Sequence, residues 1–284
     1  MKKENHPIEH TCKILDYPVS SYYRKIKAKC AQGVSPNKLA RIEHESRLIE
    51  LIKEIKSLHL FWGYRRIRAF IKNYHRIPIS YKKVFRIMKE NDLLLKPKRY
   101  KAKRTPQREK PKPYKINQWW GTDMTKFYIG DLGWVYLVVV LDWFSKKVVG
   151  YNLNVRSKST DWIAALQMAV DNNCPLGSRE YELHLMSDNG SQPTSTAYEN
   201  MSKLLGIKHI TTSYNNPKGN ADTERFMRTF KEEVVYANEF DSFEESKKKV
   251  NDFIYFYNNY YPHSKLNYLS PVDFENKLLY KDAI

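Results

Sequence analysis

The stretch that most restricts the fold is "WVYLVVVLDWF", residues 134–144, an almost unbroken apolar run. A short apolar run bounded by turn residues is typical of a strand that is buried on both faces of a sheet. The segment "GDLG", residues 130–133, predicts a tight turn before it, and residues 119–129 are rich in aromatic and β-branched side chains. These segments predict two antiparallel strands in a sheet with helices on both sides.

The rest of the back half predicts how that sheet continues. Residues 146–155 alternate like a third strand, and the helical and strand patterns then follow one another. Strands are predicted at 181–188 and 207–213, and helices at 159–172, 194–206, 220–237 and 242–260. We therefore expect an α/β fold with a mixed five-stranded sheet and flanking helices.

The front half has a different pattern, with helical periodicity and no predicted strand. Apolar residues recur on one side of residues 35–59, 64–74 and 80–91, and Ser80 is a suitable N-cap for the last of these helices. Two short basic helices joined by a short link resemble a helix-turn-helix. A small helical bundle with a basic solvent face is the alternative interpretation.

Charge is distributed unevenly along the chain. Residues 1–115 hold 31 Lys+Arg and 10 Asp+Glu, a net of +21, whereas residues 116–284 hold 18 and 21, a net of −3. Such asymmetry favours a polyanionic partner, most simply nucleic acid. No apolar run is long enough to span a bilayer and the three cysteines are scattered, so we expect no membrane partner and a cytoplasmic location.

A basic linker is predicted at residues 96–115, which hold ten Lys+Arg and four Pro without an apolar period. Proline keeps such a segment extended, and its charge suits phosphate contacts of any sequence. The predicted DNA contacts lie in the short helices, in this linker and around the helix at 220–237. They are Arg65, Arg66, Arg68, Lys82, Lys83, Lys98, Arg99, Lys101, Lys103, Arg104, Lys218, Asn220, Arg228 and Lys231.

Three acids are candidates for a metal site. Asp123 lies in the first predicted strand, Asp188 ends the fourth, and Glu224 begins the helix after the fifth. Magnesium prefers hard oxygen ligands, and two such ions can stabilise the attacking and leaving oxygens of a displacement at phosphorus. An ordinary solvated helix face, with Glu224 paired to Arg228 at i,i+4, is the plain alternative.

Other acids compete for the same role. Asp142 ends a predicted strand, and we expect it to cap the turn toward Ser145. Asp222 lies about 200° around the helix from Glu224, so the two cannot face one metal. Glu232 lies about 12 Å farther along the helix axis, which is too far to join the site.

The chain resembles the OrfB-type transposases of bacterial insertion sequences, which are related to retroviral integrases. The resemblance rests on seven stretches that run nearly end to end. These are "CKILDYPVSSYYR", "YRRIRAFIKNYHRIPISYKKVFRIMKENDL", "WGTDMTKFYI", "GWVYLVVVLDWFSKKVVGY", "SDNGSQPTS", "KGNADTERFMRTFKEE" and "YNNYYPHSKLNYLSPVDFE".

The resemblance implies a ribonuclease H-like core with Asp123, Asp188 and Glu224 as its catalytic and metal-binding acids. It implies two Mg²⁺ ions, which Mn²⁺ can replace, and cleavage followed by strand transfer between element ends and target DNA. It further implies a homo-oligomer on DNA, a nucleoid location in bacteria and an upstream-frame product or fusion as partner. The expected parts are a helical DNA-binding region at 1–95, a linker at 96–115, the core at 116–240 and a C-terminal helix and tail at 241–284.

Two other functions remain as alternatives. A ribonuclease H-type nuclease would use the same acids but stop at hydrolysis, although it would need no basic arm. A DNA-binding regulator with a silent core would keep the basic front half and have no use for three acids.

Overall fold

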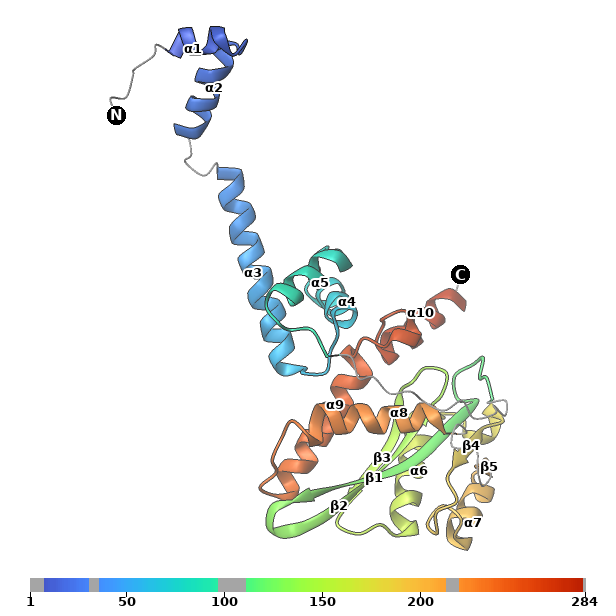
Figure 1. Cartoon of the computed structure of the whole chain (residues 1–284). Coiled ribbons are helices and arrows are strands. Elements are labelled where there is room, and N and C mark those ends of the chain that lie inside the picture. The colour runs from blue at the N-terminus through green and yellow to red at the C-terminus, as the bar shows by residue number, and fades with distance from the viewer. Residues whose placement is uncertain (1–7, 31–35, 97–110, 213–219, 283–284) are drawn as a thin grey trace. The chain divides into compact units, whose positions relative to one another are not determined.

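The structure is a computed structural model that describes residues 8–30, 36–96, 111–212 and 220–282 (Figure 1). The chain forms two compact units, Met1–Glu54 and Ile55–Ile284. No helix in the described ranges is long and apolar enough to cross a membrane.

The described front half is helical, as expected. Its helices are α1 (Ile8–Ile14), α2 (Val19–Cys30), α3 (Pro36–Leu58), α4 (Tyr64–Tyr74) and α5 (Tyr81–Glu90). The ranges predicted at 35–59, 64–74 and 80–91 correspond to α3, α4 and α5, whereas α1 and α2 were not predicted.

The link between α4 and α5 is fixed by local hydrogen bonds. The Ser80 hydroxyl accepts a hydrogen bond from the Lys83 amide at 3.2 Å, which is the predicted N-cap of α5. The Arg68 guanidinium donates to the Ile79 carbonyl at 3.0 Å and lies over the Tyr81 ring. Arg68 therefore ties α4 to the start of α5.

The sheet has five strands in the order β3-β2-β1-β4-β5. They are β1 (Trp119–Ile129), β2 (Gly133–Asp142), β3 (Val148–Asn154), β4 (His184–Ser187) and β5 (Lys208–Thr211). β1, β2 and β3 pair antiparallel, and β4 pairs parallel with both β1 and β5. The mixed five-stranded sheet is thus confirmed.

Helices and short turns follow the strands. They are η1 (Gly130–Leu132), α6 (Ser159–Asn173), η2 (Ser178–Tyr181), α7 (Thr196–Leu204), α8 (Ala221–Phe230), η3 (Lys231–Val235), α9 (Phe243–Tyr260), η4 (Ser264–Leu266) and α10 (Pro271–Asp282). The single helix predicted over 220–237 differs from the structure, because its α-helical part ends at Phe230 and continues as a π-helical turn. In this wider turn Val234 is buried, and Glu233 hydrogen-bonds His59 at 2.9 Å.

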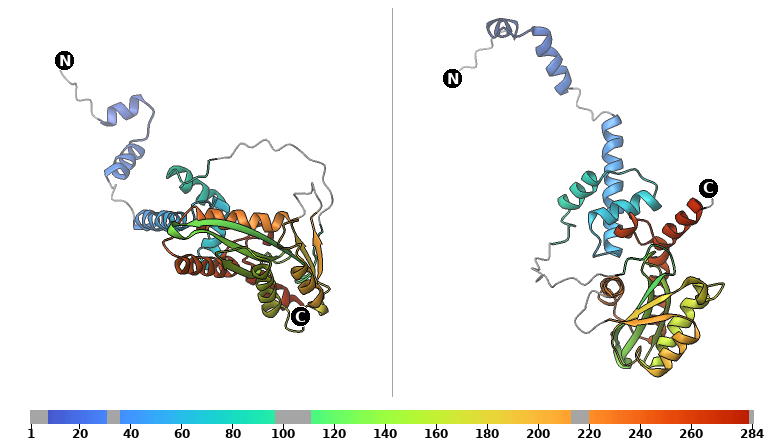
Figure 2. Two further views of the ribbon diagram at one scale, coloured as in Figure 1. Left: turned by 90° about the horizontal axis from the view of Figure 1, so that it is seen from below. Right: turned by 90° about the vertical axis from the view of Figure 1, so that its right-hand side faces the viewer.

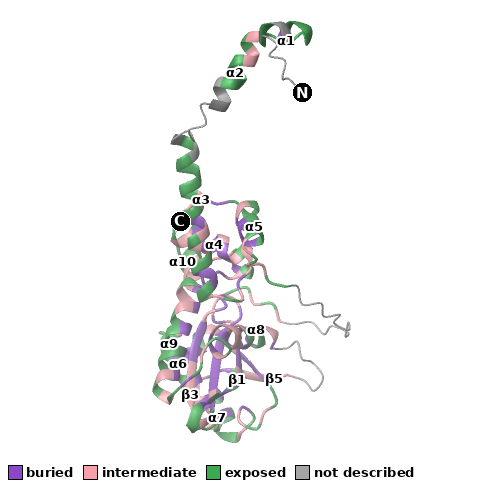
Figure 3. Cartoon of the chain, turned by 60° about the vertical axis from the view of Figure 1, so that its left-hand side comes forward, coloured by how far each residue is buried: buried purple, intermediate pink, exposed green. Residues whose placement is uncertain are grey.

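Alternation along β1 assigns its side chains to two faces of the sheet. Trp120 belongs to the core that α6 and α7 form on one face, together with residues of β2, β3 and β4. Phe127, seven residues later, packs on the other face against Phe230 of α8. Figures 1 and 2 show the sheet between α6 on one side and α8 with α9 on the other, and Figure 3 shows that buried residues concentrate in these layers.

Helix α4 contacts the C-terminal elements within the second unit. The Asn73 amide donates to the Tyr268 carbonyl at 3.1 Å, and the Tyr74 hydroxyl lies 3.2 Å from the Asp273 carboxylate. Contacts therefore group α4 and α5 with residues up to the C-terminal helix, whereas the sequence assigned them to a region ending at residue 95. The division into parts at 1–95, 96–115, 116–240 and 241–284 stays a prediction.

Candidate active site

Asp123 lies on the α8 face of β1, by the alternation that places Trp120 on the opposite face. Its side chain is half-buried, and its Oδ1 accepts a hydrogen bond from the Met124 amide at 2.8 Å. β1 and β4 run parallel with Gly121 opposite Met186. Two residues farther along the two segments stand Asp123 and Asp188.

Asp188 follows the last residue of β4 and is exposed. Its Oδ1 accepts a hydrogen bond from the Gly190 amide at 3.1 Å, which holds the carboxylate at the start of the loop. Adjacent strands lie about 4.8 Å apart, so a residue that continues β4 beside Asp123 is within electrostatic reach of it.

Glu224 is exposed in the first turn of α8. Two hydrogen bonds hold this turn to the sheet: the Asn220 amide donates to the Thr122 carbonyl at 2.8 Å, and the Trp143 indole donates to the Thr223 hydroxyl at 3.2 Å. The approach is so close that a Cβ on Gly121 would lie 2.2 Å from the Thr223 hydroxyl. The start of α8 is therefore packed directly on β1, beside Asp123.

The electrostatics of Asp123 reflect these neighbours. The pKa of Asp123 is raised to about 6, with burial as the largest cause and the carboxylates of Asp188 and Glu224 as further causes that raise it. The Met124 amide and the Lys231 ammonium act in the opposite direction. The three predicted acids thus share one electrostatic environment, in which a neighbouring negative charge disfavours ionisation of Asp123.

The three acids are electrostatically coupled, but their side chains do not form a ready set of metal ligands. Within the described ranges, no three His, Cys, Asp or Glu side chains come together as a group that could hold a metal ion. The donor chemistry nevertheless fits a hard divalent cation, because three carboxylates supply oxygen ligands and their mutual repulsion is relieved by positive charge. The acids are neighbours, and their side chains are not drawn together around one point.

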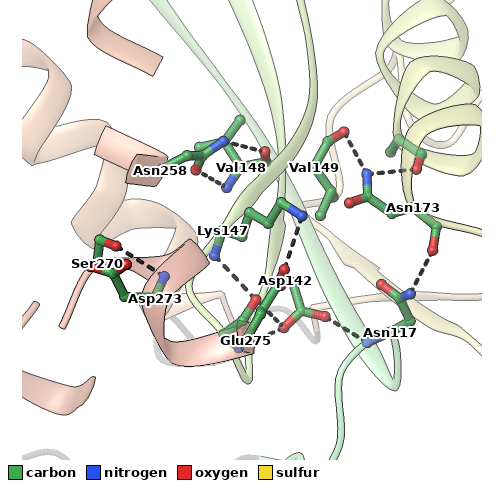
Figure 4. Close-up of polar contacts among 12 residues, drawn as sticks. Asn117, Asp142, Lys147, Val148, Val149, Asn173, Asn258, Ser270, Asp273 and Glu275 are labelled. Carbon is green, nitrogen blue, oxygen red and sulfur yellow. Dashed lines mark hydrogen bonds and ion pairs between the residues drawn. The ribbon is translucent and has the colours of Figure 1, made fainter. Parts of the chain in front are cut away.

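The competing acids have other partners. The Asp142 side chain is fully buried and accepts hydrogen bonds from the amides of Asn117, Phe144 and Ser145, at 2.7 to 2.8 Å. Figure 4 shows the bond between Asn117 and Asp142. The predicted turn cap toward Ser145 is thereby confirmed. Asp222 is likewise engaged, because it pairs with Lys146 at 3.0 Å and also with Lys265.

The predicted DNA contacts in the short helices divide into exposed and engaged side chains. Arg65 and Lys82 are exposed, and Lys83 is half-buried at the start of α5. Arg66 stacks 4.6 Å from the centre of the Tyr261 ring, and Arg68 spans α4 and α5 as described above. Arg66 and Arg68 therefore have structural partners that the sequence did not predict.

The predicted contacts around α8 also differ from one another. Arg228 is exposed, and Lys231 is close enough to Asp123 to lower its pKa. Asn220 is 5 % exposed and its amide is used to hold Thr122, so its position suits anchoring of α8 better than DNA contact. The remaining predicted contacts, Lys98, Arg99, Lys101, Lys103, Arg104 and Lys218, lie outside the described residues.

Two basic residues on α5 were overlooked. Arg86 and Lys89 are exposed, as is Lys82. The three follow a spacing of four and three residues, which places them on one side of a helix. That periodicity was available in the sequence and predicts a continuous basic stripe along α5.

Comparison with known families gives three matches along the chain. A family model described as "Integrase core domain" matches residues 113–217, and a second model with that description matches residues 205–271. A model described as "HTH-like domain" matches residues 43–101. These ranges include the five-stranded sheet, α8 and the two short basic helices.

Curated relatives are transposases. The chain is 30% identical to the transposase for insertion sequence element IS904 of Lactococcus lactis, over 75% of this chain and 87% of that protein. It is 28% identical to the putative transposase InsK for IS150 of Escherichia coli K12, over 97% of this chain and 95% of that protein.

Solved structures with a similar fold include retroviral integrase cores. The catalytic core domain of BIV integrase has a TM-score of 0.44 at 17% identity, covering 59% of this chain and 99% of that one. The HTLV-2 integrase catalytic core domain in complex with magnesium has a TM-score of 0.42 at 18% identity, covering 57% of this chain and 99% of that one.

Proposed function

The chain belongs to the insertion-sequence transposases with an integrase core domain, and is thus a DNA-acting polynucleotidyl transferase; on that premise we propose that Asp123, Asp188 and Glu224 are its catalytic acids. The observation that supports this most is the raised pKa of Asp123, to which Asp188 and Glu224 contribute. The carboxylates of Asp188 and Glu224, from segments far apart in the sequence, both act on Asp123 in the central strand β1. Such crowding of like charges is costly in a purely structural site.

These acids would hold divalent cations, which we propose to be two Mg²⁺ ions, with Mn²⁺ able to replace them. Held by these acids, such cations would supply activation of an oxygen nucleophile and stabilisation of the charge at the scissile phosphate. Because no three acids in the described ranges already form a ligand cluster, we propose that cation and DNA binding draw the carboxylates together. Asp188 and Glu224 are both exposed, so cations and DNA can reach their carboxylates.

The basic side chains near the acids would position the DNA. Arg228 and Lys231 lie about one and two helical turns beyond Glu224, where their charges suit the phosphates that flank the cleaved bond. Arg65, Lys82 and the rest of the α5 stripe would hold the duplex farther from the reaction. We propose that the chain acts on paired element ends as a homo-oligomer.

Two steps follow from this arrangement. Hydrolysis at the element end would expose a 3′ hydroxyl, and that hydroxyl would then attack a phosphodiester of the target DNA. In the first step the oxygen of water would replace the 3′ oxygen on phosphorus, so that the 3′ hydroxyl leaves and the phosphate stays on the 5′ end. In the second step the 3′ oxygen of the element would replace a 3′ oxygen of the target, which leaves as a hydroxyl. One phosphorus–oxygen bond forms and one breaks in each step, so no energy-supplying cofactor is required.

The test uses short duplexes that carry the element end, with the full chain and Mg²⁺. Asp188→Asn should reduce cleavage by at least about a thousandfold, as loss of a residue that stabilises the transition state does, and should leave DNA affinity within about twofold. Normal cleavage by Asp188→Asn would refute the assignment of the acids.

A second substrate separates the transposase from a nuclease that uses the same acids. Duplexes that already carry the free 3′ hydroxyl should be joined to target DNA by the wild-type chain. Products of hydrolysis alone, under conditions that support cleavage, would favour the nuclease. Transposition in cells that is unaffected by Asp188→Asn would favour a DNA-binding regulator.

A further inference from the structure

Asp222, in the first turn of α8, pairs with two lysines that are distant in the sequence. Its Oδ2 lies 3.0 Å from the Lys146 ammonium, and its Oδ1 accepts a hydrogen bond from Lys265. The Asp222 and Lys146 side chains are only 10% and 9% exposed. Two cations thus converge on one nearly buried carboxylate.

The two lysines come from different parts of the core. Lys146 lies in the turn between β2 and β3, with a positive φ of 63°, and its ammonium also donates to the Trp143 carbonyl in that turn. Lys265 lies in η4, which follows α9. Asp222 therefore joins the start of α8 both to the sheet and to the C-terminal segment.

The energetics of such an arrangement point to positioning. Removing charges from water is costly, and a buried ion pair is often no more stable than an apolar replacement. A buried pair does, however, require defined geometry, because a displaced carboxylate would lose its ion pairs with both lysines. The pairs therefore restrict the orientation of the helix that carries Asp222.

Neighbouring contacts fix the same turn from other sides. The Asn220 amide holds the Thr122 carbonyl, which directly precedes Asp123, and the Thr223 hydroxyl holds the Trp143 indole. At 100° per residue, Glu224 lies about 200° around α8 from Asp222, on the side away from the lysines. A small rotation of α8 about its axis would thus move Glu224 across the site.

We propose that Asp222, Lys146 and Lys265 form a positioning clamp that sets the rotation of α8, and hence the place of Glu224 relative to Asp123. This inference rests on the proposed role of Glu224. The clamp residues do not touch the substrate, and they act through the helix.

A direct test of the clamp follows hydrogen exchange in the first turn of α8 without metal or DNA. The Glu224 amide donates to the Asn220 carbonyl at 3.0 Å and reports on that turn. Asp222→Asn should speed exchange there by about tenfold, while the strands of the sheet keep their protection. Asp252→Asn, at an exposed position on α9, is the matched control and should change nothing in α8.

A second test separates positioning from DNA contact, because the Lys265 side chain is 55% exposed and its removal should not unfold the core. Asp222→Asn should lower the cleavage turnover about tenfold, since a small misplacement of a catalytic group is costly. Lys265→Met should lower turnover about threefold with unchanged DNA affinity, and should have no further effect in the Asp222→Asn background.

The two tests distinguish failure of the clamp from failure of the proposed catalytic acids. Glu224→Gln without activity, combined with normal exchange and normal turnover in Asp222→Asn, would overturn the clamp and leave the catalytic acids in place. A loss of DNA affinity in Lys265→Met that is equal in both backgrounds would instead make Lys265 a DNA contact and overturn its part in the clamp.

Discussion

Replacing Asp123 with asparagine should make the metal-free protein more stable at neutral pH. The pKa of Asp123 is raised from 3.8 to about 6, first by burial and then by the carboxylates of Asp188 and Glu224. The fold therefore disfavours the ionised form. Asn keeps the size of the side chain and removes the charge.

The magnitude follows from the pKa shift. A shift of about two units corresponds to about 3 kcal/mol at most, at 1.36 kcal/mol per unit. Because Asp123 is only half-buried, solvent screening reduces the expected gain in unfolding free energy to about 1–2 kcal/mol. The favourable contribution of protonated Asp123 is complete below pH 3.8 and is lost as the pH rises through about 6.

The assay is urea unfolding with a chelator present. Unfolding is monitored by tryptophan fluorescence, to which the buried Trp120 and Trp143 contribute. Asp123→Asn should exceed the wild type in unfolding free energy at pH 7.5, and the difference should shrink towards zero near pH 4. Added Mg²⁺ should stabilise the wild type, since a ligand that binds the folded state raises its stability, and should do less for the variant.

The opposite result would refute the reasoning. If Asp123→Asn is no more stable than the wild type at pH 7.5 without metal, then burial and the neighbouring carboxylates together do not disfavour the ionised form of Asp123. Asp252→Asn, at an exposed position on α9, should show no comparable pH dependence.

Three further predictions concern packing and DNA contact. Gly121→Ala should lower the free energy of urea unfolding by about 2–4 kcal/mol, because its Cβ would meet Thr223 and Trp143 at 2.2 and 2.3 Å. The control Gly63→Ala has open space around its Cβ and should change the unfolding free energy by no more than about 0.5 kcal/mol. His59→Phe keeps an aromatic ring that stacks on Trp62, but it removes the 2.9 Å partner of the nearly buried Glu233 carboxylate. The unfolding free energy should therefore fall by about 1–3 kcal/mol, and adding Glu233→Met should restore it. Lys82→Gln should weaken binding to all DNA sequences alike and lower the slope of log affinity against log salt by about one, while an unchanged slope would exclude phosphate contact.

The sheet could be predicted from the sequence because its signals are local. The run at 134–144 has no polar alternation, and the turn residues at 130–133 lie between two strand-like segments. Those patterns determine which residues are buried, and they predicted the five strands and the helices that follow, apart from the end of the helix over 220–237. The turn cap by Asp142 was predictable for the same reason, since its partner Ser145 is three residues away.

Contacts between distant segments could not be predicted. Nothing in the sequence near Lys265 indicates that it pairs with Asp222, 43 residues earlier in the chain. The stacking of Arg66 on Tyr261 could not be predicted either, because the two residues are far apart in the sequence. Arg66 was predicted to contact DNA from its charge alone. The π-helical turn after Phe230 was also unforeseen, because its pattern of apolar residues continues that of α8.

The central claim is that Asp123, Asp188 and Glu224 hold divalent cations at the scissile phosphate. The most direct measurement is the anomalous scattering of Mn²⁺ in crystals of the chain with element-end DNA. The account predicts a Mn²⁺ peak about 2.0–2.3 Å from carboxylate oxygens of both Asp123 and Asp188, with Glu224 drawn toward the same site. A DNA complex in which Mn²⁺ binds elsewhere and the three carboxylates remain apart would contradict it.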